Sequence, residues 1–341
     1  MRFRRFSRIS IRSIFLRAPL AAGALWRPLF WGELFVLIAA LILAAFTVAP
    51  KDPQQPDAPV DWFALGMGAF STACVFAGVQ SAATHEWPYG AAIWPFTTGI
   101  AGFVVLIVGE CRMNDGLLPF KQMLVAYAVI GFVGAAAGNA VYIADVQVFN
   151  LAAQKVVNLQ PMQIAGSEWP LFLMTIVTGV IFGVMLKSRW VPLYTLSGLI
   201  AICAGSALLF QGLQTSAADT NSAATFLIGY GAGSTITPAL FTVGLSLSRD
   251  IIARAIAAVE VVRLTIGFTS GPLTLHSIAV HGGNALLRGM HSTMLYVIGI
   301  SAFATVVVIA LLLRYYRNPH APDLVRYVKE GVPAFDSPPL A

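Results

Sequence analysis

Long uncharged apolar runs alternate with short polar breaks along almost the whole chain. The breaks contain Lys, Arg, Asp, Glu or Pro, as in residues 51–59, 110–121 and 187–189. An α-helix needs about 20 apolar residues to cross a hydrocarbon layer of about 30 Å. Nine runs have spanning length: 29–49, 61–83, 92–109, 123–144, 169–186, 191–212, 223–247, 255–276 and 293–313. Barrel strands would alternate polar and apolar residues, and these runs do not. The pattern predicts an all-α, polytopic bundle of about nine transmembrane helices.

Composition agrees with lipid as the solvent for most of the chain. Of the 341 residues, 57% are hydrophobic and only 11% are charged, and the mean hydropathy is +0.77. One soluble core could not bury so much apolar surface, and so few charges could not cover a water-facing exterior. The sequence therefore predicts an integral membrane protein whose main contact is the lipid bilayer.

Lysine and arginine in the short loops predict the orientation. Cytoplasmic loops carry an excess of both residues, and only Lys155 and Arg288 fall on the outer side if the C-terminus is cytoplasmic. The inner segments then contain Lys51, Arg112, Lys121, Lys187, Arg189, Arg249, Arg254, Arg314, Arg317, Arg326 and Lys329. We expect a protein of the plasma membrane (the cell inner membrane) with a cytoplasmic C-terminus.

The first 28 residues disagree with this arrangement. They contain seven arginines and no acidic residue. Such a basic leader is typical of a cytoplasmic segment at the membrane surface, whereas nine helices would place it outside. The remaining residues carry a net charge of −1, since the whole chain carries +6. The basic balance therefore belongs to the leader and indicates no nucleic-acid partner.

The sequence shows no pattern for catalysis or for binding a cofactor. The three cysteines and five histidines have no metal-ligand spacing. The glycine-rich stretch 229–233 lies inside an apolar run and does not follow a strand, as a nucleotide-binding loop would. We expect neither an enzyme nor a bound metal or cofactor.

A few charged residues lie where hydrocarbon disfavours them. A charge at the middle of the bilayer costs about 2.5–3.5 kcal/mol on insertion scales, so each is a candidate functional or paired group. Glu260 and Arg263 are three residues apart in the eighth run and can form an ion pair on one helical face. Asp145 and Glu33 lie near the ends of the fourth and first runs, where we expect them close to the outer membrane boundary. These four residues are the transport or gating candidates.

Small residues and prolines recur inside the predicted helices. Glycines four residues apart form faces that allow close helix packing, and prolines interrupt helices where protein or a cavity surrounds them. We expect close packing at Gly134, Gly138, Gly179, Gly183, Gly229 and Gly233, and at Pro238 in the same run as the last two. Gly271 and Pro272 predict an interruption of the eighth helix.

Four stretches, in order, resemble the C-terminal portion of the fourteen-helix drug:proton antiporter branch of the major facilitator superfamily. The first comprises Ala18 to Gly23 with Trp26 to Trp31, which resembles the loop before the sixth helix of that branch. The second, Ala49 to Pro59 followed by Asp61-Trp62, is similar to the beginning of its two extra central helices. The third, Leu159 to Gly166, precedes a helix resembling its eighth. The last comprises Gly229 to Gly233 with the following Arg249, Arg254, Glu260 and Arg263, and resembles its tenth and eleventh helices.

The resemblance implies a domain organisation. Residues 1–28 would be a basic leader and loop remnant, 29–49 an orphan first span and 50–122 two linker-type spans. Residues 123–315 would form the six-helix C-terminal half of a transporter, and 316–341 a cytoplasmic tail. The N-terminal half of that family is absent from this sequence.

The resemblance also implies a function. Alternating access rocks two halves around a central site, so the expected partner is a separately encoded N-terminal half or a second copy of the chain. The expected activity is export of small amphipathic or drug-like compounds in exchange for protons. We expect Glu260 and Arg263 to gate the site, and polar residues to line a cavity: Asn139, Tyr142, Gln160 and Gln163. The alternative is a non-transporting membrane subunit or remnant that only packs with a partner.

Overall fold

The structure is a computed structural model that describes residues 26–47, 61–84, 90–113, 117–215, 218–282, 285–316, 321–335 and 337–340. Within these ranges it is almost entirely helical, without strands, and has one isolated β-bridge, between Val125 and Pro339. The all-helical class predicted from the sequence is confirmed for this part of the chain. The basic leader lies outside the described residues as far as residue 25.

The chain divides into two compact units, residues 1–60 with 153–169, and residues 61–152 with 170–341. The first unit contains α2 (Trp26–Thr47) and α6 (Pro161–Ser167). The second contains all or most of α3 (Trp62–Thr84), α4 (Gly90–Arg112), α5 (Ala126–Lys155), α7 (Trp169–Met185), α8 (Val191–Thr215), α9 (Ala218–Thr235), α10 (Thr237–Leu245), α11 (Ile252–Gly282), α12 (Leu286–Tyr315) and α13 (Leu324–Glu330).

Seven helical stretches of the described part are long and apolar enough to cross a membrane: Trp62–Ala82, Ile93–Arg112, Ala126–Lys155, Pro161–Met185, Val191–Leu213, Ser222–Leu245 and Leu286–Tyr315. Two of them combine consecutive helices, α6 with α7 and α9 with α10. The seven stretches coincide with seven of the nine predicted runs. The other two runs are also helical but do not join this set. Helix α2 has 22 residues, and the apolar stretch found among its described side chains is Leu34–Leu43. In α11, which is 31 residues long, Thr, Ser, Gly and His residues lower the mean hydropathy.

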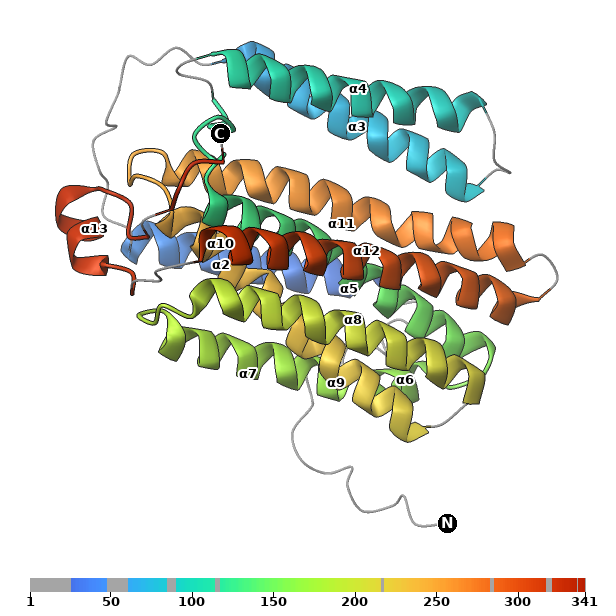
Figure 1. Ribbon diagram of the computed structural model, residues 1–341. Helices are drawn as coiled ribbons and strands as arrows, with labels where there is room; N and C mark the ends of the chain where they lie inside the picture. The colour runs from blue at the N-terminus through green and yellow to red at the C-terminus, as the bar shows by residue number, and fades with distance from the viewer. Residues whose placement is uncertain are drawn as a thin grey trace. The chain divides into compact units, whose positions relative to one another are not determined.

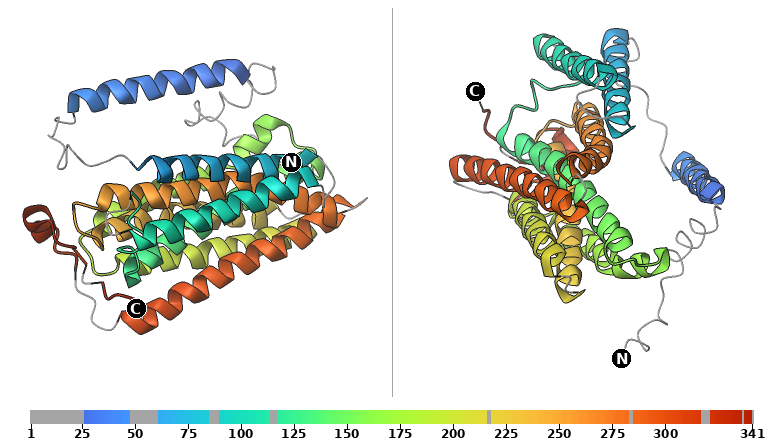
Figure 2. Two further views of the ribbon diagram at one scale, coloured as in Figure 1. Left: turned by 90° about the horizontal axis from the view of Figure 1, so that it is seen from above. Right: turned by 90° about the vertical axis from the view of Figure 1, so that its right-hand side faces the viewer.

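Within the second unit the helices that follow each other in the chain form antiparallel hairpins, as in α3–α4, α8–α9 and α11–α12 (Figure 1). The hairpin of α3 and α4 contacts α11 through α3, while α8 lies between α9 and α12 (Figure 2). Helix α10 contacts α8, α9 and α11. These contacts place α5, α8, α11 and α12 around the polar side chains described below.

Two prolines act differently from each other. The predicted span 223–247 is divided into α9 and α10 at Ile236, because Pro238 occupies the first turn of α10, where proline is favoured. Helix α11, by contrast, continues through Gly271 and Pro272. The predicted interruption of this helix is therefore wrong. A helix tolerates one proline when neighbouring helices and hydroxyl groups surround the freed carbonyl.

Four of the predicted packing glycines lie at helix crossings. A Cβ atom at Gly134 would meet Thr195 of α8, and one at Gly138 would meet Thr235 at the end of α9. On α9, a Cβ at Gly229 or Gly233 would meet residues of α7. Gly179 and Gly183 of α7 differ, since a Cβ there would meet nothing within 4 Å in the described part of the chain.

The C-terminal segment folds back onto one end of the second unit. Helix α13 begins at Asp323, whose carboxylate accepts a hydrogen bond from the Arg326 N–H at 2.9 Å, and ends at Gly331 with φ +74°. Residues 331–335 and 337–340, here called the C-terminal strap, then contact the first turn of α5 and the last turn of α10. The N–H groups of Ala334 and Phe335 both donate to the Leu245 carbonyl, at 2.8 and 3.0 Å.

Candidate functional site

An ion pair on α11 forms the first part of the site. Arg263 donates to Glu260 Oε2 from Nε at 3.1 Å, and its Nη2 group donates to the same oxygen. The side chains are only 15% (Arg263) and 28% (Glu260) exposed. The ion pair predicted from the three-residue spacing is thus present, in a partly buried position on the helix.

Asn139 connects this pair to α5. Its Nδ2 donates to the Arg263 backbone carbonyl at 3.0 Å, and Arg263 Nη1 lies 3.4 Å from Asn139 Oδ1. Asn139 is 6% exposed. A Cβ at Gly267, one turn beyond Arg263, would occupy the position of the Asn139 amide, so the glycine makes this contact between helices possible. Three of the predicted site residues, Asn139, Glu260 and Arg263, therefore form one cluster.

A hydroxyl-lined cavity of about 180 Å³ lies between α5, α11 and α12. Ala140 and Ser270 line it from the two helices that the Asn139 cluster connects. Its hydroxyl groups belong to Ser270, Thr274, Ser277, Thr293 and Tyr296. Thr293 Oγ1 donates to Ser277 Oγ at 2.9 Å, which connects α12 to α11 along the wall. Only uncharged side chains line this cavity, so it suits a neutral or amphipathic group.

Asp145 is buried inside the bundle and not at its boundary. It is 0% exposed, and its Oδ2 accepts a hydrogen bond of 2.7 Å from Ser206 Oγ of α8. Helix α5 does not end at residue 144, where the predicted run ends. It continues to Lys155 along a buried apolar face that includes Val148, Phe149 and Ala152.

Three other predicted residues lie outside these clusters. Tyr142 packs against a buried group of Val141, Ala144, Ile202 and Val297. Gln160 and Gln163 are exposed and cap α6, since Gln163 Oε1 accepts from the Gln160 N–H at 2.9 Å.

Glu33 lies in α2, and its side chain is outside the described residues.

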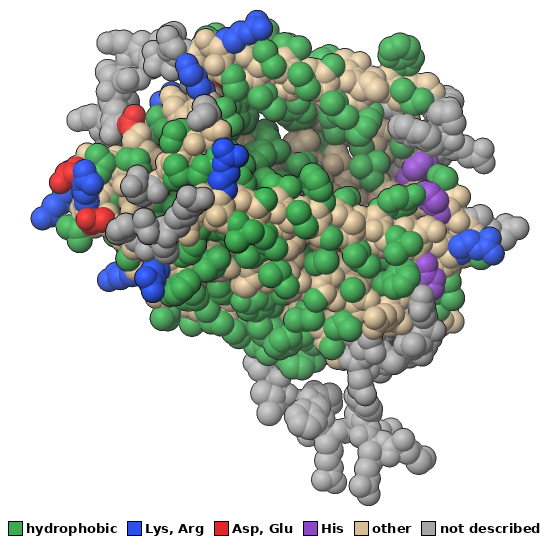
Figure 3. Space-filling view, viewed as in Figure 1, with side chains coloured by type: hydrophobic (Ala, Val, Ile, Leu, Met, Phe, Trp, Pro, Cys, Tyr) green, Lys and Arg blue, Asp and Glu red, His purple; other side chains and the backbone are tan. Residues whose placement is uncertain are grey.

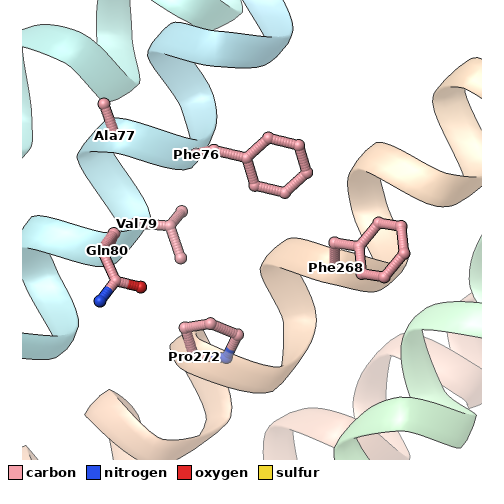
Figure 4. A pocket seen from close by; sticks show the side chains of 6 residues that line it. All are labelled: Phe76, Ala77, Val79, Gln80, Phe268 and Pro272. Atoms are coloured by element: carbon pink, nitrogen blue, oxygen red, sulfur yellow. The ribbon is translucent and has the colours of Figure 1, made fainter. Parts of the chain in front are cut away.

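A wider groove between α3 and α11 was not predicted from the sequence. It has a volume of about 590 Å³ and is lined by Phe76, Ala77, Val79, Gln80, Phe268 and Pro272 (Figure 4). The Phe76 and Phe268 rings meet edge to face, with centroids 6.2 Å apart. Pro272 was the only sign of this groove in the sequence, because the pairing of α3 with α11 depends on tertiary structure.

Charged and histidine side chains gather at different ends. On the face shown in Figure 3, most Lys, Arg, Asp and Glu side chains lie at the end that carries α13, while the histidines lie at the opposite end. Ser277 and Tyr296 of the hydroxyl-lined cavity contact His281 in the last turn of α11.

The fold defines an all-helical integral membrane protein with a buried polar centre. No protein-family model matches the chain, and no curated protein matches it.

Proposed function

We propose that the protein is a membrane transporter of the major facilitator type, which exports small amphipathic or drug-like compounds in exchange for protons. The observation that carries this proposal is the cluster of Glu260, Arg263 and Asn139 on the two helices that also line the cavity. Ionisable groups inside a membrane bundle are expensive, and they most often mark substrate or ion pathways. Interhelical polar contacts also connect the helices that must move.

The cluster suggests how a gate would work. Arg263 keeps two partners, the Glu260 carboxylate on its own helix and the Asn139 amide on α5. Protonation or substrate binding that frees Glu260 would leave Arg263 without its counter-charge, which is costly in a partly buried site. Arg263 would then move, and the Asn139 contact between α5 and α11 would break. The cavity between these helices would open as they separate.

The distribution of charge supports the proposed orientation. On the face shown in Figure 3, the end with α13 carries most of the Lys and Arg side chains, and an excess of both residues is typical of the cytoplasmic side. We place the C-terminus in the cytoplasm and the histidine-bearing end outside, in the plasma (cell inner) membrane.

Transport by reconstituted protein tests this function. Proteoliposomes with an imposed pH gradient should move a cationic fluorescent dye, and Glu260→Gln should lower the rate about tenfold or more, since it removes one partner of a partly buried ion pair. Arg263→Lys should have a milder effect, because the charge remains.

The matched control is Glu330→Gln in the exposed Arg326–Glu330 pair of α13. An exposed ion pair contributes little, so this variant should transport within about twofold of the unmodified protein. Equal rates for the Glu260 and Glu330 variants would remove Glu260 from the gate. Absence of dye movement in all reconstitutions, including those with a second membrane subunit, would reject the exporter.

The second candidate function is a subunit that only packs against other helices. It is favoured by α7, whose exposed face combines Gly179 and Gly183 with Ile176, Val180 and Val184, at 67%, 67% and 81% exposure. Small residues beside apolar ones allow another helix to approach closely, whether from a second copy of the chain or from a separately encoded subunit. This candidate is preferred if the unmodified protein moves no dye.

A further inference from the structure

Resting on the proposed exchange for protons, we propose that Asp145 is the group that binds the proton, at a site that also contains His291 along the same face of α8. The proposal deepens the transport function, since it assigns the coupling ion to one buried site on α5, α8 and α12. This site is separate from the Glu260–Arg263 gate.

Asp145 has an oxygen atom that nothing in the described structure satisfies. Its Oδ2 accepts from Ser206, whereas its Oδ1 is buried and has no hydrogen-bond partner. Native proteins rarely leave a buried polar atom unpaired, and an ionised carboxylate without a partner is the most costly case. Oδ1 is therefore the atom on which a proton would bind, converting a charged carboxylate into a neutral carboxyl.

His291 forms the second part of the site. Its Nε2 is also buried without a partner in the described part of the chain, and its ring contacts Phe210 of α8 edge to face at 5.1 Å. Ser206 and Phe210 are four residues apart, so they lie on one face of α8, one turn from each other. The unpaired carboxyl and the unpaired imidazole thus lie along the same face of α8.

No charged side chain compensates Asp145 among the described residues. Helices α8 and α12 pack around it, as the cluster of Ala144, Ile202 and Val297 shows, and α11 lines the adjacent cavity. The titratable side chains in the relevant parts of these helices are Tyr194 and Cys203 on α8, His276 and His281 on α11, and Arg288, His291 and Tyr296 on α12. None of them forms a hydrogen bond or ion pair with Asp145, and His281 is instead bonded to the Ser277 carbonyl at 2.9 Å.

The number of oxygen atoms favours a proton over a metal ion. Divalent cations such as Ca²⁺ and Mg²⁺ take about six or more oxygen ligands. The site offers one carboxylate and one hydroxyl, and Ser206 also approaches the Ile202 carbonyl of its own helix at 2.9 Å. A proton needs a single oxygen atom. It binds Oδ1 from the histidine-bearing end as the transported compound is released there, and it leaves to the cytoplasmic end before the next compound binds.

The first test compares transport driven by a pH gradient with exchange that needs no gradient. Asp145→Asn keeps the shape of the side chain but cannot bind and release a proton. In proteoliposomes it should lower gradient-driven accumulation of the dye about tenfold or more, while exchange of labelled for unlabelled dye at equal pH stays within about twofold. The control is Asp250→Asn, an exposed acid in the loop before α11. Unchanged gradient-driven accumulation by the Asp145 variant would overturn the proposal.

The second test needs no transport and separates this proposal from the proposed function. Infrared difference spectra of the purified protein between acidic and basic pH should show the C=O band of a protonated carboxyl, and Asp145→Asn should remove it. Ser206→Ala removes the hydrogen bond to Asp145 and should shift the band, which identifies Asp145 even if the asparagine variant does not fold. A band with these properties in a protein that moves no dye would keep the proton site and reject the exporter. A spectrum without the band, or one that neither substitution changes, would overturn the proton site.

Discussion

At the scale of single residues, the same sequence pattern has two different structural outcomes. Glycines four residues apart occur in both α7 and α9. In α9, Gly229 lies so close to Leu171 that an added Cβ would meet the backbone of α7. In α7, Gly183 is exposed, and a Cβ would meet nothing within 4 Å among the described residues. The spacing predicts a helix face suited to close approach, but it cannot say which face has a neighbour.

This difference predicts opposite effects of one substitution. Gly229→Ala should destabilise the protein by about 1–3 kcal/mol, because the new methyl group forces the backbones of α7 and α9 apart. Gly183→Ala is the matched control and should be neutral or stabilising by up to about 1 kcal/mol, as alanine favours the helix. Thermal unfolding in detergent measures both. Similar melting temperatures for the two variants would contradict the close crossing at Gly229.

Asp145 and the Glu260–Arg263 pair show how far the chemistry could be predicted. The pair follows from helical periodicity alone, since residues three apart share a face, and the structure contains it. The burial of Asp145 does not follow from periodicity, because a carboxylate at the end of an apolar run is typical of the membrane boundary. Only the packing of Ser206 from α8, 61 residues away in the sequence, makes it an interior group.

At the scale of helices, the effect of a proline on a helix was harder to predict from the sequence than the position of an apolar helix. Seven predicted runs are helices of spanning length and composition because their apolar character is continuous. Pro238 divides its run, whereas Pro272 lies inside a continuous α11. Pro272 lacks an N–H group, so the Phe268 carbonyl loses its partner in the helix. Both residues line the groove facing α3.

Pro272→Ala tests whether α11 bends at this proline during transport. The substitution restores an N–H donor to α11 and should stabilise the protein by about 1–3 kcal/mol. If the opening of α11 from α5 requires the bend, dye transport should fall several-fold. Pro95→Ala in α4 is the matched control, since it also removes a proline from a helix interior but leaves transport unchanged. Transport by the Pro272 variant at the original rate would show that α11 moves as a rigid helix.

At the scale of the whole molecule, the sequence predicted the helices but not the contacts that the C-terminal segment makes with them. Residues 316–341 were expected to form a cytoplasmic tail. In the structure, Tyr316 donates its hydroxyl to the Arg189 carbonyl at 2.6 Å. Burial raises the pKa of this phenol, so it remains a neutral donor at physiological pH. These contacts join segments more than a hundred residues apart, and no local pattern encodes them.

The C-terminal strap satisfies helix ends that would otherwise lack partners. The first N–H groups of an α-helix and its last carbonyls have no partner within the helix. Ala126 at the start of α5 donates to the Pro338 carbonyl at 2.9 Å, and the Tyr127 N–H donates to Ser337 Oγ at 2.9 Å. At the end of α10, the Leu245 carbonyl accepts from two N–H groups of the strap. The strap thereby joins α5, which carries Asn139 and Asp145, to α10 at one end of the bundle.

Phe335 anchors the C-terminal strap, so its removal should destabilise the protein. Its side chain is 3% exposed and meets the Tyr127 ring edge to face at 5.8 Å. Phe335→Ala leaves a cavity in this cluster and should cost about 3–5 kcal/mol of unfolding free energy. Val328→Ala on the exposed face of α13, where Val328 is 62% exposed, is the control and should change stability by less than about 0.5 kcal/mol. If Phe335→Ala unfolds at the temperature of the control, the strap contributes no stability. Unfolding at a lower temperature would instead show that the strap holds α5 and α10 together at this end of the bundle.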